Sequence, residues 1–158
     1  MTVASVRAWF EQHAPDLHLI ETPEPTATVQ QAAAVHGVEP GQIAKTLSLR
    51  VAERTLLVVA RGDARLDNRK LREAFGAKAT MLDADTVVAL TGHPVGGVCP
   101  FGLATALPVY CDRSLLAFGE VMPAAGGTHT AVRITPQRLA ELTGAEWVDV
   151  TQALPATA

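Results

Sequence analysis

The sequence has few aromatic residues, few cysteines and no apolar run long enough to span a bilayer. Aromatic residues make up 4% of the 158 residues, so the core must be built mainly from Val, Leu, Ile and Ala. Cys99 and Cys111 form no CxxC pattern, which argues against a zinc cage or disulfide framework and favours a reducing compartment. The N-terminal stretch also lacks the apolar core of a signal peptide. These absences predict a cytoplasmic protein with no membrane partner.

Positive charge is also scarce. Lysine and arginine number 13 against 16 aspartates and glutamates, for a net charge of -3. Duplex nucleic acid is bound by neutralising many phosphates at once, so duplex DNA is not an expected partner, although a small site for one or two phosphates is compatible. The content of 48% hydrophobic and 18% charged residues is typical of a folded chain. The length predicts a single domain over residues 1–158.

Common catalytic and metal-binding signatures are missing as well. GxSxG and GxxxxGK[ST] do not occur, and no two histidines have HxxxH spacing, so we expect neither a metal nor a cofactor. His93 and Cys99 are close enough in sequence to suggest a thiol-dependent enzyme as one alternative. No third group is evident to orient His93, and Pro100 removes the backbone donor after the cysteine. We therefore expect Cys99 to be a small apolar filler.

Hydrophobic periodicity and turn residues predict alternating helices and strands. The expected helices cover residues 2–13, 28–36, 67–75, 83–91, 114–118 and 135–143. The expected strands cover residues 17–21, 43–52, 55–60, 107–111, 130–134 and 147–150. The order has no strict βαβ rhythm, so the predicted fold class is α/β (α+β), a mixed sheet with packed helices.

The strand over residues 43–52 carries a lysine among apolar side chains. Alternation puts Lys45 on the same face as Ile43, Leu47, Leu49 and Val51. Either the lysine sits at the end of the strand and reaches solvent, or it is a cation at the rim of an apolar pocket, placed to meet an anionic ligand. The segment 61–73, which is rich in both basic and acidic residues, also has two interpretations. It is either a solvent-exposed helix face or a surface beside the pocket that contacts substrate phosphates.

The segment TGHPVGGVCPFGL, residues 91–103, is the most irregular part of the chain. Its glycines let a ligand approach main-chain groups closely, and its prolines stiffen the loop. Such a backbone can bind a carbonyl or a developing oxyanion without a side-chain base. A later pair, Gly126 and Gly127, precedes Thr128 and His129, which form either an ordinary turn or a second wall of the same pocket.

IAKTLSLRV followed by TGHPVGGVCPFGL resembles the YbaK-type domain family, freestanding relatives of the editing domain of bacterial prolyl-tRNA synthetases. The resemblance extends from about residue 20 to about residue 150. It implies a compact domain with a mixed, partly closed sheet, and hydrolysis of the ester between a wrong amino acid and tRNA, typically tRNA(Pro). The acceptor end of aminoacyl-tRNA is the implied partner, with prolyl-tRNA synthetase or another translation factor as a carrier.

The resemblance also implies site residues. Lys45 matches the family lysine that holds the phosphate of the terminal adenosine, and residues 96–100 match the loop that cradles the aminoacyl group. The implied catalytic residues are Lys45, Gly96 and Gly97, and the implied substrate-binding residues are Thr46, His93, Val98, Cys99, Pro100, Phe101, Gly126, Gly127, Thr128 and His129.

The amino acid that would be removed is indicated by a departure from the family pattern. Ala125 stands where YbaK-type cysteinyl-tRNA deacylases carry a serine. A small amino acid (alanine, serine, threonine, cysteine or 2-aminobutyrate) is therefore the expected class. The same lysine and loop would also serve a non-catalytic module that binds an aminoacyl-adenosine or a nucleotide, and this alternative stays open.

Overall fold

The computed structural model describes residues 3–153, so the expected helix residue Thr2 lies outside the described part. The helices are α1 (Val3–His13), α2 (Val29–His36), α3 (Asn68–Phe75), α4 (Ala84–Thr91) and α5 (Pro136–Thr143), with short 3₁₀ turns η1 (Pro40–Gln42) and η2 (Arg113–Ala117). The strands are β1 (Ile20–Glu21), β2 (Ile43–Val51), β3 (Arg54–Arg61), β4 (Ala79–Met81), β5 (Val109–Asp112), β6 (Met122–Pro123), β7 (Thr130–Ala131) and β8 (Glu146–Val148). Among these residues, no helix combines the length and apolar character needed to cross a bilayer.

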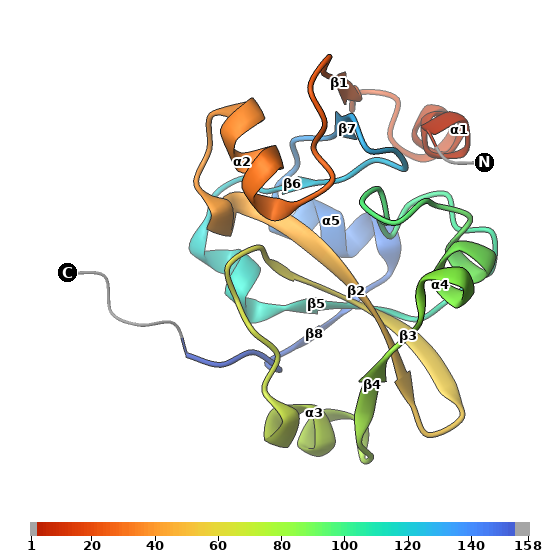
Figure 1. Cartoon of the computed structure of the whole chain (residues 1–158), viewed down its shortest axis with the longest axis vertical. Helices are drawn as coiled ribbons and strands as arrows, with labels where there is room; N and C mark the ends of the chain where they lie inside the picture. The colour runs from red at the N-terminus through yellow and green to blue at the C-terminus, as the bar shows by residue number, and fades with distance from the viewer. Residues whose placement is uncertain (1–2, 154–158) are drawn as a thin grey trace.

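A mixed sheet forms the centre of the molecule (Figure 1). Its strand order is β4-β2-β3-β5-β8, and β6 also pairs with β2. The pairs β2–β3 and β2–β4 are antiparallel, whereas β2–β6, β3–β5 and β5–β8 are parallel. A small second sheet joins β1 to β7. The mixed sheet with packed helices confirms the predicted fold class.

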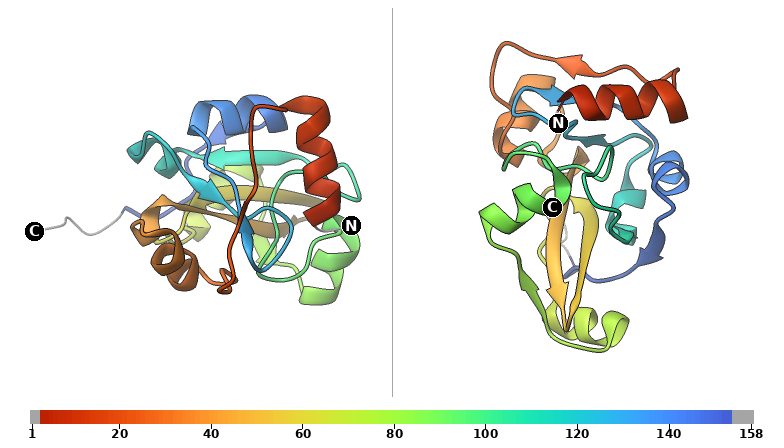
Figure 2. Two further views of the ribbon diagram at one scale, coloured as in Figure 1. Left: turned by 90° about the horizontal axis from the view of Figure 1, so that it is seen from above. Right: turned by 90° about the vertical axis from the view of Figure 1, so that its right-hand side faces the viewer.

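The long hairpin β2–β3 separates two apolar clusters. Leu57 and Val59 on one face pack with α1, α5 and the loop after α4. Leu56 and Val58, which alternate with them, pack on the other face with Leu71 of α3. Figures 1 and 2 show α1 and α3 at opposite ends of the molecule. Each face of the hairpin therefore has its own core.

Local capping signals explain why several predicted helices form where they do. Thr28 and Gln31 make a capping box at the start of α2, and Gly37 ends it in the left-handed conformation. Asp67 and Asp83 accept hydrogen bonds from main-chain N–H groups in the first turns of α3 and α4. These caps are read directly from sequence, and the four helices after α1 start and end within one or two residues of the predicted bounds.

The strands differ more from the prediction. The strand expected over residues 17–21 is only Ile20–Glu21, and that expected over 130–134 is only Thr130–Ala131. The helix expected over 114–118 is a 3₁₀ turn. Strands β4 and β6 were not predicted, because each has only two or three residues and forms by pairing with distant β2. Both of these short strands matter for the site.

Candidate functional site

A cavity of about 350 Å³ lies beside β2, between α2, α4 and the loop after α4. This volume is at the lower end of the range of small-ligand sites. Its polar lining residues are Thr26, Thr28, His36, Lys45, Thr46, Ser48 and Thr130, and its apolar ones include Ala27, Ala32, Ile43, Val87, Val95, Val98 and Met122. The wall is therefore largely apolar, with several hydroxyl groups on it.

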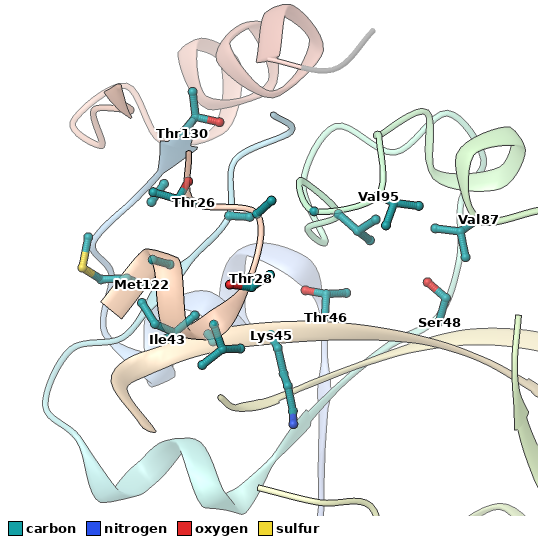
Figure 3. A pocket seen from close by; sticks show the side chains of 18 of the residues that line it. Thr26, Thr28, Ile43, Lys45, Thr46, Ser48, Val87, Val95, Met122 and Thr130 are labelled. Atoms are coloured by element: carbon teal, nitrogen blue, oxygen red, sulfur yellow. The ribbon is translucent and has the colours of Figure 1, made fainter. Parts of the chain in front are cut away.

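The cavity opens where β2 has a free edge. On that side β6 pairs with Ile43 and Ala44, and β4 pairs with residues 49–51. No described strand pairs with residues 45–48 there, although Ser48 O accepts a hydrogen bond from Leu82 N at 3.1 Å, and this stretch of main chain borders the cavity. Thr46 and Ser48 both project from β2 toward the cavity (Figure 3). The Oγ1 atom of Thr46 is buried and has no hydrogen-bond partner within residues 3–153.

The side chain of Lys45 points to the opposite side of β2 from Thr46 and Ser48 (Figure 3). Only the part of Lys45 near the strand borders the cavity, and Nζ donates a hydrogen bond to the carbonyl oxygen of Ala64. Burial lowers the pKa of Lys45, and nearby Asp63 opposes this effect. The phosphate-binding role of Lys45 stays a prediction.

The two glycine pairs meet backbone to backbone. Gly96 has a φ of 90°, and it lines the cavity against Ala27. Gly126 N donates to Gly97 O at 3.0 Å. A Cβ on Gly97 would lie 2.6 Å from Gly127 N. The loop 94–100 thus keeps its position because glycine allows it to touch the 126–127 segment directly.

Main-chain N–H groups of this loop differ in their availability. Gly97 N donates to Pro94 O at 2.9 Å, which closes a turn. The N–H groups of Gly96 and Val98 have no acceptor among the described residues, and both residues line the cavity. The N–H group of Gly97 is therefore already engaged, and its catalytic role stays a prediction.

His93, Cys99 and Phe101 lie in the core beneath the loop and do not line the cavity. All three have 0% exposure, and Phe101 packs against Trp9 and Phe10 of α1. The structure therefore places all three outside the cavity that the loop borders, and their contact with substrate stays a prediction. Pro100 is also buried and outside the lining.

The His93–Cys99 pair exists but is not arranged for nucleophilic attack. His93 Nε2 lies 3.6 Å from Cys99 Sγ, and it donates to Phe101 O at 2.7 Å. Burial lowers the pKa of His93, which keeps the imidazole neutral, and its Nδ1 has no partner within residues 3–153. The nitrogen nearest the thiol therefore carries a proton and cannot act as its base.

The second glycine segment supports the cavity wall without lining it. Gly126, Gly127, Thr128 and His129 are absent from the lining, and the side chain of His129 is exposed. Thr128 O accepts from Thr26 N, which holds the cavity residue Thr26 in place. Of the predicted site residues, the cavity brings together Lys45, Thr46, Gly96 and Val98.

Sequence reasoning missed several residues of the cavity, namely Thr26, Thr28, His36, Ser48 and Thr130. Thr28 and His36 were recognised only as the ends of a helix. Ser48 had a detectable signal, because alternation places it on the same face as Thr46. His36 Nε2 is buried without a partner in the described part of the chain, and burial lowers the pKa of this histidine. Within residues 3–153, no three His, Cys, Asp or Glu side chains gather as a metal site.

We expect Cys99 to resist alkylation in the folded protein. Burial raises the pKa of its thiol from 9.0 to about 12, and that of Cys111 also to about 12. The thiols therefore stay protonated in the folded chain while unfolded thiols ionise near pH 9, so stability should fall as pH rises from about 9 to 12. Iodoacetamide treatment at pH 8, followed by mass spectrometry, should label neither cysteine until denaturant is added. Rapid native labelling of Cys99 would contradict this result.

The comparisons with known proteins agree with this architecture. Residues 23–142 match the family described as the aminoacyl-tRNA editing domain. The uncharacterized protein YwhH of Bacillus subtilis (strain 168) is 45% identical over 152 residues, which cover 95% of this chain and 97% of that protein. A crystal structure described as a candidate trans-editing enzyme for prolyl-tRNA synthetase superposes with a TM-score of 0.88 at 34% identity, covering 96% of this chain and 97% of that one.

Longer relatives contain the same domain as a part. Proline–tRNA ligase of Geobacter sp. (strain M21) is 33% identical over 107 residues, which cover 67% of this chain and 19% of the ligase. The chain therefore matches about a fifth of that ligase and nearly all of YwhH. The match over residues 23–142, together with the likeness over almost the full length of YwhH, shows that this chain belongs to the aminoacyl-tRNA editing domain family.

Proposed function

We propose that the chain is a cytoplasmic aminoacyl-tRNA deacylase that acts in trans. Its substrate would be tRNA, with tRNA(Pro) as the first candidate, carrying a small wrong amino acid of the alanine, serine, threonine, cysteine or 2-aminobutyrate class. The observation that carries this proposal is the cavity at the free edge of β2, in which Gly96 and Val98 border the same space as Thr46. The relation to prolyl-tRNA synthetases supports the choice of tRNA.

The proposed reaction uses main-chain groups rather than a side-chain nucleophile. Water attacks the carbonyl carbon of the ester, and the resulting oxyanion accepts hydrogen bonds from the N–H groups of Gly96 and Val98. Donors held in place before the reaction stabilise such a charge most effectively. The bond from the carbonyl carbon to the ribose oxygen then breaks, and the ribose oxygen takes the proton that the attacking water gives up. The products are free amino acid and uncharged tRNA, so atoms and charge balance.

The substrate supplies part of the chemistry in this proposal. The neighbouring ribose hydroxyl would help to position the attacking water, in keeping with the family resemblance. The aminoacyl side chain would lie among the alanines and valines of the cavity. The size of this side chain would then be the main factor that decides which amino acids are accepted. A difference of one methylene in such a pocket is worth about 1–3 kcal/mol. Discrimination against larger amino acids should therefore be steeper than discrimination among small ones.

A panel of charged tRNAs tests this function. tRNA(Pro) carrying alanine, serine, threonine, cysteine, 2-aminobutyrate or proline is incubated with the protein, and ester hydrolysis is measured against the spontaneous rate. At least one small amino acid should be released well above background while prolyl-tRNA is spared. Binding of an aminoacyl-adenosine analogue without turnover on any tRNA would instead favour the non-catalytic module.

A variant that narrows the cavity provides the matched control for this panel. Val95 lines the cavity and is 59% exposed, so Val95→Trp adds bulk at the opening without disturbing the core. Leu116→Trp changes a similarly exposed residue, 47% exposed, that is outside the lining. Val95→Trp should slow hydrolysis of every substrate, and Leu116→Trp should not.

A further inference from the structure

We propose that the hydroxyl group of Ser48 selects aminoacyl groups that carry a side-chain hydroxyl, namely serine and threonine. The inference rests on the proposed function for the substrate, and it addresses a choice that this function leaves open. Serine and alanine differ by one hydroxyl, and so do threonine and 2-aminobutyrate. A purely apolar wall separates such pairs poorly, because a hydrophobic pocket does not strongly reject a near-isostere with an added hydroxyl. A polar group in the wall is needed to distinguish them.

Ser48 is a buried polar residue without a hydrogen-bond partner for its side chain. It lines the cavity and is only 4% exposed. Its hydroxyl group forms no hydrogen bond with another residue in the described range 3–153. Buried hydroxyl groups in native proteins are nearly always paired, because an unpaired one lowers stability. The partner of this hydroxyl is therefore expected to be a group that enters the cavity.

The sheet around Ser48 offers its hydroxyl no side-chain partner. Ser48 is directly opposite Leu57 of β3, and residues opposite each other in an antiparallel pair share a face. On the other side of β2, Ser48 O accepts a hydrogen bond from the main chain of Leu82, which also lines the cavity. Thr46 is two residues away, about 7 Å along the strand, and its Oγ1 has no partner within residues 3–153 either. The hydroxyl of Ser48 thus lies between two leucines and stays free to meet a ligand.

The end of the cavity that contains Ser48 is next to the proposed oxyanion donors. Ser48 projects from β2 toward Val87 of α4 and toward Val95 (Figure 3). Val95 directly precedes Gly96, whose N–H group is one of the two proposed donors. An ester carbonyl bound by that donor would therefore lie beside this end of the cavity. The two valines would contact the carbon atoms of the aminoacyl side chain, and Ser48 would contact its hydroxyl.

The chemistry of a serine hydroxyl suits this selection. It can donate one hydrogen bond and accept others, so it can pair with a second hydroxyl in either direction. A thiol is a weaker donor and acceptor, which makes cysteine a poorer match. An alanyl or 2-aminobutyryl side chain would displace water from Ser48 and leave its hydroxyl unpaired. A net hydrogen bond gained or lost in this way corresponds to about a 10-fold difference in affinity.

Non-hydrolysable analogues test the selection without relying on catalysis. The probes are 3′-aminoacylamino-3′-deoxyadenosines, in which an amide replaces the ester, carrying threonine, 2-aminobutyrate, serine or alanine. Wild-type protein should bind the threonyl compound about 10-fold more tightly than the 2-aminobutyryl compound, and the seryl compound likewise more tightly than the alanyl compound. Ser48→Ala should bind both members of each pair about equally. Ser114 is outside the cavity lining, so Ser114→Ala is the matched control and should keep the preference.

Thermal melts separate selection from a structural role of Ser48. The hydroxyl that Ser48→Ala removes has no partner in the described part of the chain, so the melting temperature should stay the same or rise. A residue kept for ligand binding at a cost in stability shows this behaviour. A lower melting temperature together with an equal loss of affinity for all four compounds would show that Ser48 is structural, and would overturn the inference.

Hydrolysis is the third readout, and it separates this inference from the proposed function. On tRNA(Pro), wild-type kcat/KM for the threonyl ester should exceed that for the 2-aminobutyryl ester about 10-fold, and Ser48→Ala should remove this difference. Hydrolysis of small aminoacyl esters without a preference for the hydroxyl, or with a preference that survives in Ser48→Ala, would overturn the inference and leave the proposed function intact. A binding preference that depends on Ser48, without hydrolysis of any ester, would overturn the proposed function alone.

Discussion

Gly97→Ala is expected to lower kcat/KM for ester hydrolysis about 100-fold or more. The added Cβ would lie 2.6 Å from Gly127 N and 2.8 Å from its Cα and C atoms, closer than side-chain carbons approach a backbone. These are main-chain atoms, so the neighbour cannot rotate away. The two loops must separate, which moves the N–H groups of Gly96 and Val98. A displacement of about 1 Å at a reacting centre costs on the order of 100-fold in rate.

The backbone conformation of Gly97 makes this variant informative. Its φ is outside the left-handed region, so alanine brings no conformational strain, only the steric clash. Overpacking of this kind should also reduce the free energy of unfolding by about 1–3 kcal/mol. Gly119→Ala is the matched control, since a Cβ there meets nothing within 4 Å. Hydrolysis rates and thermal melts of both variants are the measurements, and near-normal activity of Gly97→Ala would show that the loop position is not critical.

Lys45→Ala is expected to reduce both stability and activity, for a reason different from loss of a phosphate contact. The ammonium group donates to Ala64 O, which belongs to a buried residue. The same turn contains Gly62, where an added Cβ would meet Val29 of α2 and Pro40 O. Lys45 therefore holds a turn that packs against a cavity wall. Removing its charged hydrogen bond should cost about 2 kcal/mol and let that wall shift, lowering kcat/KM about 10-fold.

Two substrates distinguish the possible roles of Lys45. If the lysine holds the turn, Lys45→Ala loses activity equally on aminoacyl-tRNA and on phosphate-free 3′-aminoacyl-adenosine, and its melting temperature falls. A loss confined to aminoacyl-tRNA, with unchanged melting temperature, would instead restore the phosphate-binding role implied by the family resemblance. Arg72→Gln, which removes an exposed arginine on α3, is the control for a general loss of positive charge.

Several features were predictable because their signals are local. Helix α2 is capped by Thr28 at its start and by Gly37 at its end, and both capping residues act within a few positions of their own helix. The hairpin β2–β3 follows from alternation and a short turn. The irregular loop was recognised by its glycines and prolines. The free edge of β2 was not predictable, since it depends on where the short strands β4 and β6 end.

The directions of side chains were only partly predictable. Alternation already separates Lys45 from Thr46, because adjacent strand residues face opposite sides of a sheet. The family resemblance nevertheless suggested both as site residues, and only Thr46 projects into the cavity (Figure 3). For His93, Cys99 and Phe101 the loop has no such regular period, and Phe101 is buried by contact with Trp9 and Phe10 of α1, from the start of the chain.

The amino-acid sequence alone determines the mixed fold class, the helix caps, the glycine-rich loop and the resemblance to editing domains. These follow from interactions between residues near one another in the chain, or from motifs that need no coordinates. Only tertiary packing determines which face of β2 borders the cavity and which main-chain N–H groups of the loop after α4 have no acceptor among the described residues. Each depends on strands and loops far apart in sequence, since the cavity is the space that β4, β6, α2, α4 and the loop after α4 leave beside β2.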